Sequence, residues 1–245
     1  MISVCMATYN GAKYIRPQLD SILCQLGDED ELVISDNFSN DGTIEIIKSY
    51  NDKRIKLFEF EPNRKLLKTR HGMEKNITNN FENSLKKCKG DYVFFADQDD
   101  VWKKDKIEKM MVYLRDYDLV MCNATTIDGD DNILLERLYP ISPIRKGIFS
   151  FRARGCLFGV TRKLIDIFLP VPKLIVSHDL WAGIIAEFCK SYYFLDEPLI
   201  LHRRNIGNAS TDVSQKSQNS LFYKIYYRIN LLIHGFIRVK TRGGK

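Results

Sequence analysis

The chain has 245 residues, of which 44% are hydrophobic and 28% are charged, so it can bury a substantial core and is not expected to be disordered. The formal net charge of +6 is unevenly distributed. From Val213 onward there are seven Lys or Arg and no Asp or Glu, which leaves 30 basic against 31 acidic residues in the rest. A nearly neutral body therefore precedes a basic tail.

The six cysteines are scattered along the chain, without a CxxC pair. We expect buried free thiols, which suit a reducing compartment. The sequence shows no secretory signal pattern, and no apolar run reaches the roughly 20 residues needed to span a bilayer. These features predict a cytoplasmic protein.

The first hundred residues alternate strand-like and helical patterns. Apolar runs that predict strands lie at residues 2–7, 32–35, 55–60 and 92–96. Helical spacing lies between them, at residues 15–26, after Thr43, and around Phe81 and Leu85. Such alternation predicts a parallel sheet that is covered by helices on both faces.

After Asp100 the pattern changes. Residues 107–114 have helical spacing, residues 119–123 predict a strand, and residues 164–168 predict a short helix that ends before Pro170. A further helix opens at Ser177 and carries Trp181 on its apolar face.

Polar side chains cluster where the predicted strands end. These positions are Thr8, Tyr9 and Asn10 after the first strand, Asp36 after the second, and Asp97, Gln98, Asp99 and Asp100 after the fourth. Parallel sheets bind ligands beyond the carboxyl ends of their strands, so these loops predict a ligand site.

Asp97, Asp99 and Asp100 place three carboxylates within four residues. Their mutual repulsion favours a divalent cation, and hard carboxylate oxygens suit Mg²⁺ or Mn²⁺. Asp97 and Asp99 can point the same way on an extended segment. The alternative is a solvated acidic turn in which Asp100 caps a helix that begins near Lys103. Neither GxGxxG nor a P-loop motif occurs, so a metal would have to neutralise bound phosphates.

Three segments in order, ISVCMATYNGAKYIRPQLDSIL, ELVISDNFSNDGT and KGDYVFFADQDDVW, resemble family 2 glycosyltransferases over about residues 1–210. The FADQDDVW form is similar to bacterial transferases that build O-antigen, capsule or rhamnan chains, rhamnosyltransferases among them. The resemblance implies an α/β protein with the GT-A fold: a Rossmann-like, mostly parallel sheet flanked by helices, followed by a C-terminal helical tail. It also implies an inverting, metal-dependent enzyme.

The resemblance implies roles for individual residues. Thr8, Tyr9 and Asn10 would line the nucleotide pocket beside Gln98, and Asp36 would bond a pyrimidine base. Asp97 would contact ribose or sugar, and Asp99 would bind Mn²⁺ or Mg²⁺. The SHDLWAGIIAEF segment resembles the family segment whose aspartate is the base, here Asp179. On the residues alone, helix capping is the favoured role of Ser177 and Asp179, because capping is the commonest function of such residues.

The segment DEPLILHRRNIGNAS departs from the family pattern. His202 replaces a usual Tyr, and Asn205 stands where many members have a His, so Arg203 or Arg204 is expected to grip the phosphates. RGCLFGVTRKL resembles the floor of the sugar pocket, where glycine allows close approach, although a tight turn explains the glycine equally well. Candidates for the sugar or acceptor pocket are Asp100, Trp102, Gly155, Cys156, His178 and Trp181.

The predicted reaction moves a sugar from UDP-hexose or dTDP-rhamnose onto a hydroxyl of a growing surface polysaccharide carried on polyprenyl diphosphate. Residues 1–100 would bind the nucleotide sugar, and residues 101–212 would bind the acceptor within the same domain. Residues 213–245 would form a basic amphipathic tail.

The tail carries an apolar stripe beside basic residues. Its members are Leu221, Phe222, Ile225, Ile229, Leu232, Ile233 and Phe236, with Lys224 and Arg228 elsewhere on the helix. This composition predicts peripheral association with the cytoplasmic face of the inner membrane. The alternative is a helix that packs on the body or dimerises. Nucleic acid is not expected, because the cations lie beside a broad apolar stripe.

Two other functions fit parts of the sequence. Residues 97–101 match the DxDx(T/V) loop of haloacid-dehalogenase-type phosphohydrolases, although three predicted strands precede it here, whereas that family places it after its first strand. A non-catalytic protein that binds nucleotide sugars would share the same loops.

Overall fold

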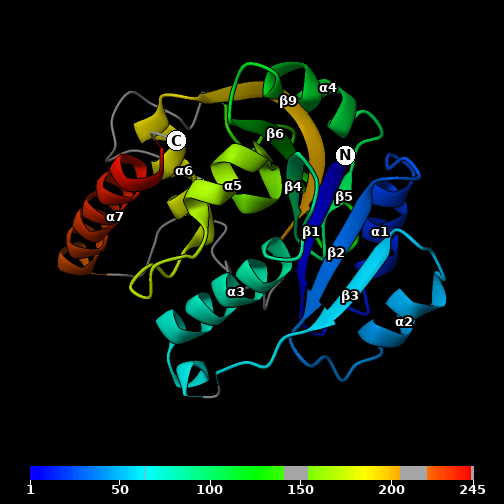
Figure 1. The fold of residues 1–245 in the computed structure, drawn as a ribbon. Coiled ribbons are helices and arrows are strands. Elements are labelled where there is room, and N and C mark those ends of the chain that lie inside the picture. Colours follow the sequence, from blue (N-terminus) through cyan, green and yellow to red (C-terminus); the bar gives the residue numbers. More distant parts are fainter. Residues whose placement is uncertain (64, 141–153, 205–219, 244–245) are drawn as a thin grey trace.

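A nine-stranded mixed sheet organises the computed structural model, which describes residues 1–63, 65–140, 154–204 and 220–243. The strands lie in the order β3-β2-β1-β4-β8-β6-β9-β5, with β7 paired to β6 (Figure 1). Both predicted halves of the body therefore contribute to a single sheet.

The first half of the sheet is parallel, as predicted. Its strands are β1 (Ile2–Thr8), β2 (Glu31–Asp36), β3 (Ile55–Glu59) and β4 (Tyr92–Ala96). Every residue of β2 is buried, because helices cover both faces. Thr8 is paired with Asp36, so the ends of β1 and β2 lie side by side.

The second half of the sheet mixes directions. Its strands are β5 (Val101–Trp102), β6 (Leu119–Ile127), β7 (Ile133–Leu135), β8 (Phe158–Thr161) and β9 (Tyr192–Arg203). β8 runs antiparallel between β4 and β6, whereas β9 runs parallel to β6. β6 extends four residues past the predicted end, where Thr125, Thr126 and Ile127 pair with the last residues of β9.

Helices flank the sheet on both sides (Figure 1). On one side lie α1 (Ile15–Leu23), α2 (Thr43–Ser49) and α4 (Lys106–Leu114), and on the other lie α3 (Arg70–Leu85), α5 (Arg162–Phe168) and α6 (His178–Cys189). Two short 3-10 turns, Leu66–Lys68 and Gly155–Leu157, complete the body. All six cysteines are free thiols, as expected. Four of them are buried, as predicted (Cys5, Cys88, Cys122 and Cys156), whereas Cys24 is exposed and Cys189 is partly buried.

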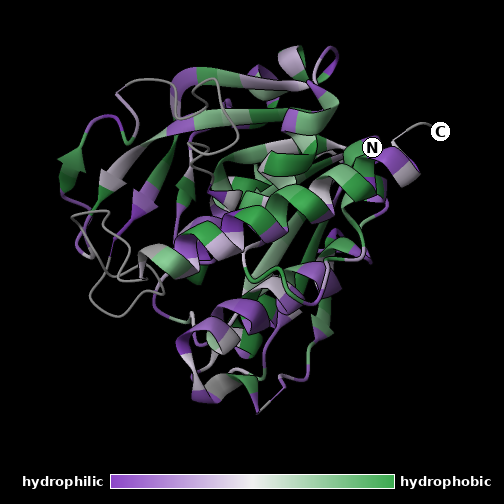
Figure 2. Ribbon diagram, turned by 90° about the vertical axis from the view of Figure 1, so that its left-hand side faces the viewer, coloured by the Kyte–Doolittle hydropathy of each residue, from purple (hydrophilic) through white to green (hydrophobic). Residues whose placement is uncertain are grey.

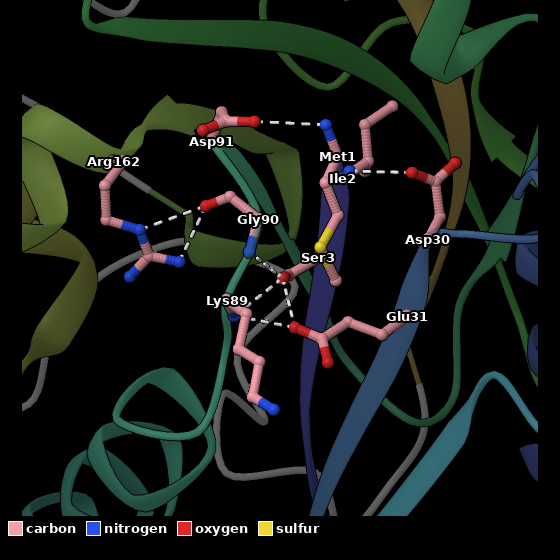
Figure 3. Close-up of polar contacts among 9 residues, drawn as sticks. All are labelled: Met1, Ile2, Ser3, Asp30, Glu31, Lys89, Gly90, Asp91 and Arg162. Carbon is pink, nitrogen blue, oxygen red and sulfur yellow. Dashed lines mark hydrogen bonds and ion pairs between the residues drawn. The ribbon is translucent and has the colours of Figure 1, made fainter.

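A polar cluster ties β1, β2 and β4 together where these strands begin (Figure 3). Ser3 Oγ donates to Glu31 Oε1 at 2.6 Å, and Lys89 N donates to the same oxygen at 2.6 Å. Gly90 N donates to Ser3 Oγ at 2.7 Å, and a Cβ at Gly90 would lie 2.5 Å from Ser3 N. These contacts fix the register of β1 relative to β2 and β4, and this register also determines how the opposite ends of the strands are aligned.

The described part of the tail, residues 220–243, contains one long helix, α7 (Leu221–Arg242), which packs against α5 and α6. Leu231 is buried, and a Cβ at Gly235 would lie 2.4 Å from Ile184 Cγ2, so the helices are in close contact. Arg238 Nη1 donates to Ile167 O at 3.0 Å and to Phe168 O at 3.1 Å. The tail is thus part of the folded body.

Most of the predicted apolar stripe of the tail stays exposed on one face of α7, and other residues of the helix turn inward. Figure 2 shows α7 across the near face, with hydrophobic and hydrophilic residues alternating along it. Residues such as Leu231 turn inward, whereas an outer face leaves apolar side chains exposed: Phe222, Ile225, Tyr226, Ile229, Ile233, Phe236 and Ile237. Within the described part of the chain, no helix is both long enough and apolar enough to cross a membrane.

Candidate active site

The loops after β1 and β2 are joined through Asp36. Thr8 Oγ1 donates to Asp36 Oδ2 at 2.6 Å, and Ser39 donates its N–H and its hydroxyl to the two carboxylate oxygens, each at 2.7 Å. Asp36 is fully buried. The carboxylate therefore organises both loops, and its contact with a base stays a prediction.

Gln98 ties the loop after β4 to the loop after β1. Tyr9 N donates to Gln98 Oε1 at 2.8 Å, and Gln98 Nε2 donates back to Tyr9 O at 3.0 Å. A Cβ at Gly11 would lie 2.5 Å from Gln98 Oε1, so glycine makes room for this pairing. The predicted donor residues Thr8, Tyr9, Asn10 and Gln98 thus come together at one edge of the sheet.

Three other carboxylates lie near Asp97. Burial, followed by the nearby carboxylates of Asp100, Asp99 and Asp179, raises the pKa of Asp97. Asp179 comes from α6, more than 80 residues further along the chain, so the fold adds a fourth carboxylate to the three that are adjacent in sequence. Gln18 Nε2 donates to Asp97 O at 2.7 Å and holds this loop against α1.

These carboxylates fit a divalent cation. Asp97 and Asp99 offer hard oxygen ligands, and the crowding that raises the pKa of Asp97 is relieved when positive charge enters. The residues present are therefore consistent with the Mg²⁺ or Mn²⁺ expected from the sequence.

Asp100 lies beneath this loop and has a different environment. It is fully buried, and its Oδ1 accepts from Arg203 N and from His202 Nδ1, both at 3.0 Å. Arg154 Nη1 lies 3.3 Å from His202 Nε2. Because a guanidinium only donates, Nε2 accepts, and Nδ1 carries the hydrogen that goes to Asp100. Asp100 is therefore no helix cap: α4 begins at Lys106, with Asp105 at the cap position.

A possible ligand set for a metal occurs at the same place. Asp100, Cys156 and His202 each offer one ligand atom, and these three atoms lie within 4.8 Å of one another. Burial, together with the carboxylates of Asp100 and Asp97, raises the pKa of Cys156, which keeps it a thiol. His202 hydrogen-bonds Asp100 Oδ1, whereas the buried Asp100 Oδ2 has no hydrogen-bond partner among the described residues.

Arg203 does not have the predicted position for gripping a phosphate. Its Nε donates to Asp99 O at 3.0 Å and its Nη1 to Asp128 O at 2.9 Å, while Nη2 pairs with Asp131 at 2.7 Å. The guanidinium also lies over the ring of Tyr14. Arg203 instead supports the loop of Asp99, because its donors are already engaged within the protein.

Arg204 lies near a second arginine. It is half-buried, and this burial, together with the nearby Arg154 guanidinium, lowers the pKa of Arg204. The two neighbouring guanidinium groups repel each other, and an anionic diphosphate bound near them would reduce this repulsion. Asn205, which stands where many family members have a His, lies outside the described residues.

Asp179 lies in the first turn of α6 beside the N-cap residue Ser177. Leu180 N donates to Asp179 Oδ1 at 2.8 Å, and Ser177 Oγ donates to the same oxygen. The cap is thus confirmed for Ser177, whose oxygen also accepts from Leu180 N. Both hydrogen bonds described for the Asp179 carboxylate involve Oδ1, which leaves Oδ2 as the candidate for proton transfer.

His178 packs into the site beside Asp179. Its ring stacks on Phe81 with centroids 4.2 Å apart, and burial lowers its pKa, so it is neutral near pH 7. A Cβ at Gly155 would lie 2.7 Å from His178 Nε2. The glycine of the predicted pocket floor therefore makes room for a histidine.

Both tryptophans that were predicted for the pocket belong to the core. Trp102 is 3% exposed, and its ring lies under Lys106, with Nζ 3.6 Å from the centroid. Trp181 has no exposed surface, and its Nε1 donates to Phe168 O at 3.0 Å. Neither side chain can contact a ligand in this structure, because the core fills the space around each.

Two supporting residues were not predicted. Gln18 lies on the apolar face of α1, and Lys106 Nζ, fully buried, donates to Cys156 O at 3.1 Å. Burial lowers the pKa of Lys106 to about 8. A polar residue within an apolar helical face was the available signal in both cases, since each sits at the spacing of the neighbouring core positions.

Comparison with protein-family models supplies the class: residues 3–159 match the family described as Glycosyl transferase family 2. The chain belongs to glycosyltransferase family 2. The Bacillus subtilis glycosyltransferase TuaG is 31% identical over 139 residues, which are 52% of this chain and 51% of TuaG. The match to an uncharacterized glycosyltransferase of Haemophilus influenzae, 36% identical, covers 51% of this chain and 46% of that protein. The chain therefore spans about half the length of these two relatives.

A longer match joins the chain to an Escherichia coli family member. WfgD, a UDP-Glc:alpha-D-GlcNAc-diphosphoundecaprenol beta-1,3-glucosyltransferase, is 22% identical over 96% of this chain and 93% of its own length.

Solved structures confirm the fold. Staphylococcus aureus TarS 1–349 in complex with UDP superposes with a TM-score of 0.66 at 19% identity, covering 99% of this chain and 73% of that one. The mannosyltransferase PcManGT of Pyrobaculum calidifontis, in complex with GDP-Man and Mn²⁺, has a TM-score of 0.57 at 15% identity, covering 99% and 75%. The chain has the GT-A fold, and the phosphohydrolase alternative is wrong, since the acidic loop follows the fourth strand of a glycosyltransferase sheet.

Proposed function

We propose that this glycosyltransferase moves a sugar, with inversion, from a nucleotide diphosphate sugar onto a hydroxyl of a growing surface polysaccharide. The observation that carries the proposal is that Asp179 of α6 lies near enough to the carboxylate loop after β4 to raise the pKa of Asp97. The carboxylates of the loop after β4 suit a divalent cation that binds the charged donor. The carboxylate of Asp179 suits the acceptor hydroxyl, whose proton it would accept.

The donor would bind across the loops after β1, β2 and β4. Tyr9 is exposed there, and Asn10 orders the neighbouring loop by accepting from Asn40 N at 3.0 Å. We propose a pyrimidine nucleotide, in a UDP-hexose or dTDP-rhamnose. The UDP and UDP-GlcNAc complexes of TarS support a uridine nucleotide on this fold.

The chemistry needs one base and one displacement. The acceptor oxygen bonds to the anomeric carbon as its proton passes to Asp179, and the bond to the diphosphate breaks with its electron pair leaving on phosphate oxygen. A single displacement from the opposite face inverts the anomeric centre. Arg204, which lies near Arg154, would offset the charge that develops on the leaving diphosphate.

Asp99, with Asp97 beside it, would hold Mg²⁺ or Mn²⁺. When bound, the cation would supply positive charge for the diphosphate. The Mn²⁺ complex of PcManGT supports this assignment on the same fold.

The acceptor would be a saccharide on polyprenyl diphosphate. WfgD, whose name gives a diphosphoundecaprenol acceptor, supports this class. The exposed apolar face of α7 and the basic residues of the tail support a position at the cytoplasmic face of the inner membrane, where such an acceptor would be reached.

The first test measures melting temperature against nucleotides and nucleotide sugars, each with and without Mn²⁺. Because a ligand of the native state raises the melting temperature, we expect a shift with UDP or dTDP that requires the metal. Asp99→Ala should abolish the shift, whereas Asp105→Ala, at the cap of α4, should keep it. No shift with any nucleotide would contradict the proposal.

A transfer assay with the selected donor then tests the base. Asp179→Asn should retain the nucleotide-dependent shift but lose activity by about a thousandfold, because the amide cannot accept the proton. Near-normal turnover would exclude Asp179 as the base. Donor binding without turnover in the wild-type protein would favour the non-catalytic alternative.

A further inference from the structure

The segment of residues 172–178 leads into α6 and is held first from α3. Lys75 Nζ donates to Pro172 O at 3.0 Å and to Ile175 O at 2.8 Å. Thr78 Oγ1 donates to Val176 O at 2.7 Å. Side chains of α3 thus supply hydrogen bonds to backbone carbonyl groups of this segment, which in most loops bond to water or to other groups of the same loop.

α7 holds the same segment from its other side. The hydroxyl oxygen of Tyr227 accepts two adjacent backbone hydrogen bonds, from Val176 N at 3.2 Å and from Ser177 N at 3.0 Å. Burial raises the pKa of Tyr227, so this hydroxyl stays neutral. Ser177 Oγ then donates to Asp179 Oδ1. Tyr227 is therefore one residue removed from the proposed base.

Tyr227 is itself held in a fixed place. Its ring stacks on Tyr223, with centroids 6.0 Å apart, and Tyr223 stacks on His71 of α3 at 4.2 Å. Further along α7, Arg238 Nη2 donates to Pro170 O at 2.8 Å, and its guanidinium lies over the ring of Trp181. Both ends of the helix are thus anchored, and the hydroxyl of Tyr227 has a defined position.

We infer that Tyr227 is a positioning residue for sugar transfer, through which α7 holds the turn before α6 so that Asp179 keeps one orientation. This inference rests on the proposed function, in which Asp179 is the base. Without the hydroxyl, two N–H groups lose their partner, and the turn must move to satisfy them. A displacement of about 1 Å at a catalytic group can cost roughly a hundredfold in rate.

The test compares Tyr227→Phe with Tyr223→Phe, which removes a hydroxyl from the neighbouring ring of the same stack. For Tyr227→Phe we expect kcat to fall about 10- to 100-fold, with the donor KM and the nucleotide-induced melting shift unchanged, because the donor loops lie after β1, β2 and β4. Tyr223→Phe should keep the wild-type kcat. Thr78→Val, which loosens the same turn from α3, should lower kcat in the same way.

Hydrogen exchange gives a readout that is independent of activity. The amides of Val176 and Ser177 should exchange faster in Tyr227→Phe than in Tyr223→Phe, because only the first variant removes their acceptor. Unchanged exchange, or a wild-type kcat in Tyr227→Phe while Asp179→Asn is inactive, would overturn the positioning role alone. Loss of donor binding in Tyr227→Phe would also overturn it, by showing a general effect on the fold. Full activity of Asp179→Asn would instead overturn the proposed base, and this inference with it.

Discussion

At the scale of single residues, Lys106 shows how the fold supports a crowded acidic site. Its ammonium group has no contact with solvent, lies over the ring of Trp102 and donates to Cys156 O. The charge lies near Asp97 and Asp100, whose carboxylates favour its protonated form. Burial has the larger effect and lowers the pKa of Lys106 to about 8. The side chain is thus a buried cation beneath the carboxylate loop, held at a cost in stability.

That cost predicts a pH dependence. Between pH 8 and the ordinary pKa of 10.5, the unfolded chain holds a proton that the folded chain releases, so raising the pH through this window favours the folded state. The unfolding free energy of the wild type, relative to Lys106→Met, should therefore rise by up to about 3 kcal/mol between pH 7 and pH 10.5. Urea titrations at several pH values would measure it. Lys104→Met, which removes an exposed ammonium, should follow the wild type, and an identical curve for Lys106→Met would contradict the argument.

At the scale of elements, the sheet keeps its structural and functional contacts at opposite ends. The cluster of Ser3, Glu31 and Gly90 joins β1, β2 and β4 where they begin (Figure 3). Asp36 and Gln98 join the loops where the same strands end. Because strands are stiff, alignment at one end is carried to the other. The first cluster should therefore stabilise the protein without contacting a ligand.

Ser3→Ala tests this separation. The change leaves the buried N–H of Gly90 without its acceptor, so the free energy of unfolding should fall by about 1–3 kcal/mol. Ser49→Ala on the exposed surface of α2 removes a hydroxyl that bonds Ile46 O and should change stability by less than about 0.5 kcal/mol. Urea unfolding measures both. The nucleotide-induced melting shift should be kept in Ser3→Ala; its loss would show that the two ends are not independent.

At the scale of the whole molecule, α7 carries two surfaces with different roles. Its inner face packs on α5 and α6 and supplies Tyr227, whereas its outer face leaves Phe222 87% exposed. Deletion of residues 213–245 would remove both surfaces together, so it cannot separate membrane binding from catalysis. Substitutions confined to the outer face can.

We expect Ile229→Ser combined with Ile233→Ser to weaken sedimentation with anionic vesicles by at least about tenfold, because two exposed apolar side chains no longer enter the interface. Val112→Ser serves as the control, since Val112 is 58% exposed on α4. Activity on a soluble acceptor should be kept in both proteins. Equal sedimentation of all three proteins, or none with the wild type, would contradict a membrane role for this face.

The sequence by itself determined the parallel strands, the order of the three motifs and the positions of the carboxylates, because apolar runs and the polar residues after them are local signals. It did not identify β5, β7 or β8, which have only two, three and four residues and therefore no measurable period. It also missed β9, whose apolar pattern is interrupted by Asp196, Glu197 and Pro198. Only the tertiary structure decided that Trp102 and Trp181 are core residues and that the donors of Arg203 are already engaged. It also brought Asp179 to Asp97 and Tyr227 to Ser177, since burial and long-range hydrogen bonds depend on which elements pack together.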